Sequence, residues 1–71
     1  MSIEINFING NDSGLTTLVK LDFKNLLKPL RKYKVTYDLG KCEGYISALV
    51  STGFISVDEY ERLKQEIRKI L

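Results

Sequence analysis

The sequence predicts an α+β domain, and three observations lead to that prediction. Apolar and polar residues alternate near the N-terminus, which is the pattern of a half-buried strand. Turn-forming residues cluster at positions 9–14, and a second β-rich run follows them. Near the C-terminus, helix-capping residues mark two helices and the turn between them. We therefore expect an antiparallel β-hairpin, a short basic helix and a C-terminal αα-hairpin in a single small domain spanning 1-71.

The predicted β-hairpin occupies the first 23 residues. Its first strand, at residues 2–8, places Ile3, Ile5 and Phe7 on one face because side chains alternate along a strand. Its second strand is expected at residues 15–23. The residues sharing one face of that second strand would be Thr17, Val19, Leu21 and Phe23.

A short basic helix is expected next, at residues 24–33, where Leu27 and Leu30 recur at helical spacing. Pro29 restricts this helix, because proline lacks the N–H that an interior position donates. Pro29 therefore lies either in the first turn or at a kink. Residues 34–39 alternate in polarity and suit either a third short strand or an extended connector.

A further helix is expected to begin between Asp38 and Gly44 and to end near Thr52. Gly40, Gly44 and Ala48 are spaced four apart, so on a helix they would form a strip without bulky side chains. Two interpretations remain open. Either the glycines belong to a loop and the helix begins only at Gly44, or the strip allows another element or subunit to approach closely.

Helix-capping residues mark the boundaries of the C-terminal αα-hairpin. Gly53 has the position of a left-handed residue that ends a helix, and Phe54 would then fold back onto Leu49. Ser56 and Glu59 form an SxxE capping box at the start of the last helix. That helix has an apolar stripe, which we expect to be an oligomer or partner face, formed by Tyr60, Leu63, Ile67 and Ile70.

Composition argues against catalysis and against a membrane-spanning protein. The chain has no histidine and one cysteine, so the commonest general base is missing and no thiolate metal cluster can form. Cys42 beside Lys41 suits a buried structural thiol better than a nucleophile, since no histidine can activate it. We expect no enzyme activity, no cofactor, no metal site, no membrane partner and a cytoplasmic location. Because a core of this size supplies little stability, we also expect a homo-oligomer or a hetero-complex.

Basic residues are concentrated in the middle of the chain. Positions 20–34 hold six of the eleven lysines and arginines, opposed only by Asp22. Such a segment is often merely the solvated face of a helix, but it also suits an acidic protein surface or the phosphates of a nucleic acid. The residues predicted to bind a partner are the basic ridge and two nearby tyrosines, namely Lys24, Lys28, Arg31, Lys32, Lys34, Tyr33 and Tyr37.

Residues 46–71 carry one resemblance to a known family. The pattern consists of Leu49, Gly53, Ile55, Ser56, Glu59, Tyr60 and Leu63. It resembles the helical hairpins of the short C-terminal domain type, and this resemblance implies an interaction or oligomerisation module. As a small α+β chain without catalytic groups, it also resembles phage-encoded regulators and inhibitors. The expected function is a non-catalytic protein-interaction module, a regulator or inhibitor of a phage or mobile element that binds a host or phage macromolecule. The alternative is a nucleic-acid-binding module that uses residues 20–34.

Overall fold

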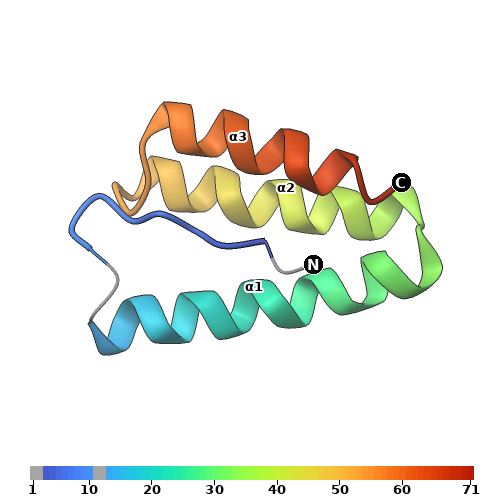
Figure 1. The fold of residues 1–71 in the computed structure, drawn as a ribbon, viewed down its shortest axis with the longest axis horizontal. Helices are drawn as coiled ribbons and strands as arrows, with labels where there is room; N and C mark the ends of the chain where they lie inside the picture. Colours follow the sequence, from blue (N-terminus) through green and yellow to red (C-terminus); the bar gives the residue numbers. More distant parts are fainter. Residues whose placement is uncertain (1–2, 11–12) are drawn as a thin grey trace.

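The computed structural model describes residues 3–10 and 13–71 and contains three helices (Figure 1). The helices are α1 (Gly14–Tyr33), α2 (Thr36–Ser51) and α3 (Val57–Arg68). The described residues form no β-strand, so the predicted α+β class is wrong and the fold is all-α. α2 packs against both of the other helices.

α1 is one continuous helix in place of the predicted second strand and short helix. Ser13 caps it, because the Ser13 Oγ accepts a hydrogen bond from the Thr16 N–H at 3.1 Å. Pro29 lies inside the helix, in its C-terminal half. The strand predicted at 15–23 is wrong, because the buried positions of this segment recur at helical spacing and continue to Leu30. Thr17 and Leu21, which would share one strand face with Val19 and Phe23, are exposed. The buried residues of α1 are Thr16, Val19, Phe23, Leu27 and Leu30.

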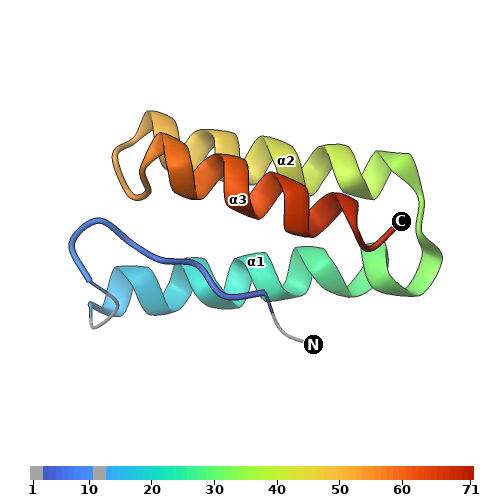
Figure 2. The same cartoon turned by 45° about the horizontal axis from the view of Figure 1, so that its top comes forward.

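The N-terminal segment at residues 3–8, called the strap below, is extended but pairs with no strand within the described residues. It lies between α1 and α3 (Figures 1 and 2). Ile5 and Phe7 are buried, whereas Glu4 and Asn6 are exposed. The alternation therefore reports an extended segment with one buried face, but that face covers helices and not a sheet. Position 2 of the predicted strand and positions 11–12 of the predicted turn lie outside the described residues.

The connection between α1 and α2 is very short. Lys34 adopts a left-handed conformation with φ of 53°, and its N–H donates to the Leu30 carbonyl at 2.9 Å. Val35 is extended, and α2 begins at the next residue, so the segment at 34–39 is neither a strand nor an extended connector. Gly40 and Gly44 lie inside α2 and are not loop residues. A Cβ built on either glycine has no neighbour within 4 Å, so nothing in the described chain approaches the strip closely.

The αα-hairpin formed by α2 and α3 confirms the predicted turn and the predicted N-cap, but only half of the predicted capping box. Gly53 has a φ of 82°, and the Phe54 N–H donates to the Leu49 carbonyl at 2.9 Å, which is the predicted left-handed ending. The Ser56 Oγ accepts from the Glu59 N–H at 3.1 Å, as expected for the N-cap of α3. The Glu59 carboxylate, however, bonds to the strap and to Arg62.

The hydrophobic core receives side chains from the strap, all three helices and the loop before α3. Because the strap separates α1 from α3, its apolar residues complete the core between those helices (Figure 2). The buried hydrophobic residues are Ile5, Phe7, Val19, Phe23, Leu27, Leu30, Cys42, Ile46, Leu49, Ile55, Leu63 and Ile67.

Candidate functional site

The cations of α1 and of the turn after it form a surface that we call the basic surface. Its members are Lys20, Lys24, Lys28, Arg31, Lys32 and Lys34, all of them exposed. No member is in an ion pair within the described residues. The ion pairs described there take their cations from α3 and its C-terminal cap, namely Arg62, Lys64, Arg68 and Lys69. The positive charge of α1 is therefore not neutralised by the described part of the fold.

The two predicted tyrosines lie at the end of α1 and the start of α2. Tyr33 is 63% exposed and Tyr37 is 73% exposed. A lysine lies over each ring, with the Lys32 Nζ 5.3 Å from the centre of Tyr33 and the Lys41 Nζ 5.6 Å from the centre of Tyr37. These are cation–π distances. The structure thus places both rings in solvent, next to the end of the basic surface.

Three leucines on α1 were missed as surface residues by the sequence reasoning, because a strand was expected there. Leu15, Leu18 and Leu21 are each more than half exposed. They occupy the N-terminal half of α1, and Lys24 continues the helix immediately beyond them. The exposed part of α1 therefore combines apolar and basic side chains. The signals that could have revealed this are the N-cap at Ser13, which marks the start of a helix, and the helical spacing of the buried residues that follow it.

The apolar stripe of α3, predicted to be an oligomer or partner face, lies mostly inside the chain's own core. Leu63 and Ile67 have no exposed surface. Tyr60 and Ile70 are partly buried and pack against the core, and the Lys64 Nζ lies 5.0 Å from the centre of the Tyr60 ring. Leu63 and Ile67 are therefore not accessible to a partner, because they pack in the core, and only Tyr60 and Ile70 keep some exposed surface.

Glu59 fastens the strap to α3 and is the most buried charged residue described. Its carboxylate accepts hydrogen bonds from the Asn6 N–H at 2.7 Å and from the Arg62 guanidinium at 2.6 and 2.7 Å. Arg62 also donates to the Glu4 carbonyl at 2.6 Å. Burial alone raises the pKa of Glu59, but the hydrogen bonds from Arg62 and Asn6 outweigh it and hold that pKa below its ordinary value.

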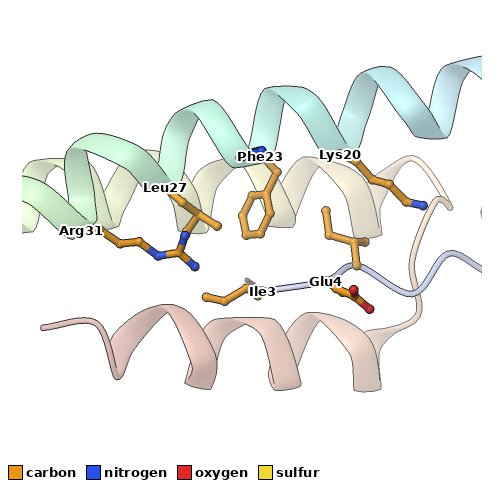
Figure 3. A pocket seen from close by; sticks show the side chains of 8 residues that line it. Ile3, Glu4, Lys20, Phe23, Leu27 and Arg31 are labelled. Carbon is orange, nitrogen blue, oxygen red and sulfur yellow. The ribbon is translucent and has the colours of Figure 1, made fainter. Parts of the chain in front are cut away.

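A cavity of about 310 Å³ lies on the other side of the strap, against α1 (Figure 3). Its apolar lining comes from the strap and from the inner face of α1. Three members of the basic surface also line it, with Lys20 and Arg31 at its two ends and Lys24 between them along α1. Glu4 is its acidic lining residue. Sequence reasoning missed this cavity, because it depends on where the strap lies. The apolar lining residues are Ile3, Ile5, Phe23 and Leu27.

Cys42 is fully buried, and its Sγ lies 3.4 Å from the Leu26 carbonyl oxygen, to which the thiol donates. Burial, with help from Asp38, raises the pKa of the Cys42 thiol. It therefore has the properties of a structural thiol and not those of an activated nucleophile. In the described chain no three side chains of the His, Cys, Asp or Glu type come together as metal ligands. None of the helices described is both long and apolar enough to cross a membrane.

Comparisons with protein-family models, with curated proteins and with solved structures find no match to this chain. The resemblance of residues 46–71 to the short C-terminal domain type therefore stays a prediction. The local geometry on which it rests is present, since Gly53 and Ser56 form the two caps that the pattern requires. That geometry is also ordinary helix-capping chemistry, so it carries no function by itself.

Proposed function

We propose that this chain is a small non-catalytic binding module that uses the exposed face of α1 to bind an acidic surface of a partner protein. One observation carries the proposal. The basic surface has no ion-pair partner within the described residues, whereas the cations of α3 are paired. Unpaired charges of one sign on one helix attract a surface of the opposite sign and speed its association.

The exposed leucines favour a protein over a nucleic acid as the partner. Leu18 and Leu21 lie on the same helix as the lysines and are 59% and 53% exposed. A protein interface typically combines an apolar centre with a charged rim, whereas contacts to phosphates need the cations alone. We propose that such a module acts as a regulator or inhibitor encoded by a phage or mobile element, because the sequence has no histidine and its one cysteine is buried.

A nucleic-acid partner remains the second candidate, and a separate observation favours it. Tyr33 and Tyr37 are exposed beside Lys32 and Lys41, and aromatic rings next to cations are the usual platform for single-stranded bases. Binding of this kind weakens steeply as salt rises, because each phosphate contact releases counterions. Gel shifts with duplex and single-stranded probes at two salt concentrations test this candidate directly.

Site-specific photo-crosslinking in cells that naturally express the chain tests the leading proposal. Leu21→p-benzoylphenylalanine places the crosslinker on α1, and the same replacement at the exposed Gln65 of α3 is the matched control. We expect position 21 to capture a discrete protein, and we expect Lys28→Glu combined with Lys32→Glu to reduce that capture at least tenfold. Equal capture from position 65, or no loss on charge reversal, would show that α1 is not the binding face. Nuclease-sensitive material at position 21 would favour the second candidate.

A further inference from the structure

We propose that the cavity between the strap and α1 binds a small amphipathic anion, a molecule with an apolar stem that ends in a carboxylate. This inference does not rest on the proposed function. Lys28 and Lys32 belong to the basic surface but do not line the cavity. The two sites can therefore be tested by separate substitutions on the same helix.

The cavity lies along the side of the strap that faces α1. Three hydrogen bonds join the strap to α3 and to the loop before it, from the Asn6 N–H to Glu59, from Arg62 to the Glu4 carbonyl and from the Ile8 N–H to the Phe54 carbonyl at 2.9 Å. On the α1 side Ile5 joins the core cluster that includes Phe23 and Leu27. The cavity lies beside this contact, between the strap and α1 (Figure 3).

The chemistry of the lining matches an amphipathic anion. Apolar surface for a stem comes mainly from Ile3 and from the aliphatic parts of the lysine and arginine side chains, because Phe23 and Leu27 are only 1% and 2% exposed. In Figure 3 the Arg31 side chain extends from α1 toward the strap, and Lys20 stands at the opposite end of the cavity. Arg31 presents a planar fork of donors that fits a carboxylate in bidentate fashion. Three cations without an ion-pair partner among the described residues, against the carboxylate of Glu4, leave the lining positive, so a cation or a neutral stem gains less there than an anion.

The volume limits the size of the ligand. Small-molecule sites usually measure about 300–1,000 Å³, so a cavity of about 310 Å³ is at the small end of that range. A water molecule occupies about 30 Å³ of liquid, so the space accommodates roughly ten groups of that size. A medium-length alkyl carboxylate such as decanoate fills it. An acetate ion leaves most of the apolar lining uncovered, and the stem of a long-chain fatty acid extends beyond the cavity.

Decanoate, below its micelle-forming concentration, is the probe for this site. It is titrated into the full-length, ¹⁵N-labelled protein, and amide shifts are followed by NMR. We expect saturable shifts that centre on the lining residues, with a Kd of about 1 mM or lower for a ligand of this size. Decanol and decyltrimethylammonium have the same stem without the negative charge, and acetate has the charge without the stem. Each of these three should bind at least fivefold more weakly.

Arg31→Gln and Lys28→Gln form the matched pair of variants. Both remove one positive charge from an exposed position of α1, but only Arg31 lines the cavity. Arg31→Gln should weaken decanoate at least fivefold and Lys28→Gln less than twofold, in proteins whose spectra show the native fold. Equal losses in the two variants would reduce the effect to general electrostatic attraction and overturn the proposal. Shifts that do not saturate, or decanol binding as tightly as decanoate, would overturn it as well.

Discussion

Replacing Glu59 with glutamine should detach the strap from α3. Glutamine keeps the shape of the side chain but has one acceptor oxygen and an NH₂ group that only donates. It cannot satisfy the Asn6 N–H and both donors of Arg62, which lie 2.6–2.7 Å from the present carboxylate. A hydrogen bond to a charged group contributes about 1.5–3 kcal/mol. Because the Arg62 side chain is 43% exposed, water replaces part of the loss, and we expect Glu59→Gln to lower the free energy of unfolding by about 2 kcal/mol.

The pH dependence of that loss follows from the sign of the pKa shift. The pKa of Glu59 in the folded chain lies below its ordinary value, because the hydrogen bonds from Arg62 and Asn6 outweigh the effect of burial. A depressed carboxyl pKa stabilises the fold above the unfolded pKa of about 4.3 and stops doing so as the pH falls through the folded pKa. The wild-type protein should therefore lose stability below about pH 4.3. Glu59→Gln lacks this contribution, so the gap between the two proteins should narrow on acidification.

Urea unfolding followed by circular dichroism at neutral and acidic pH measures both effects. Glu61→Gln is the matched control, because Glu61 is also on α3 and pairs with Lys64 at 3.5 Å, but its side chain is 53% exposed. We expect the control to cost less than about 0.5 kcal/mol, as surface pairs usually do. Hydrogen exchange at the Asn6 amide should accelerate in Glu59→Gln, and in Glu61→Gln it should stay close to the wild-type rate. Equal costs for the two variants, or an unchanged Asn6 amide, would refute the reasoning.

Three further predictions concern caps and the buried thiol. Gly53→Ala should destabilise the protein by about 1–2 kcal/mol in thermal melts, and by backbone strain alone, since φ is 82° and a Cβ there has open space. Ser13→Ala removes the hydrogen bond from the Thr16 N–H and should lower the free energy of unfolding by about 1 kcal/mol in urea melts. It should also lower the helical content at the start of α1, and an unchanged free energy of unfolding would argue against the cap. The Cys42 thiol should react with a thiol reagent only at the rate of unfolding, because it is fully buried and its pKa is raised, so fast modification of the native protein would contradict the structure.

The sequence predicts correctly the part of the fold whose signals are local, namely the turn and the cap between α2 and α3. The turn at Gly53 and the cap at Ser56 involve residues within five positions of one another, so their geometry needs no tertiary information. The segment at 15–23 behaves differently. Its β-branched residues and its period-two spacing favour a strand locally, but the buried positions continue at helical spacing through Leu27 and Leu30. The longer helical register, opened by the cap at Ser13, decides the structure.

The candidate site could be predicted only as a set of residues. The concentration of cations at 20–34 is visible in the sequence, and the structure places these cations on exposed positions of α1 and the turn that follows. The cavity was not predictable, because it depends on where the strap lies relative to α1 and α3. Glu59 was assigned to a local capping box, and its contact with Asn6 spans 53 positions. No local pattern reports a contact of that separation.

The spacing of the lysines strengthens the case that α1 serves binding. Lys20, Lys24, Lys28 and Lys32 follow each other at intervals of four on one helix. Like charges at that spacing destabilise a helix by about 0.2–0.5 kcal/mol for each pair. Lys28→Glu should therefore stabilise the isolated protein slightly, because two repulsions become attractions, while it weakens binding to an acidic partner. If Lys28 contributed only to the fold, the same substitution would lower the stability of the protein. A gain in the stability of the isolated protein, together with a loss of affinity for the partner, is expected of a residue that serves binding and not folding.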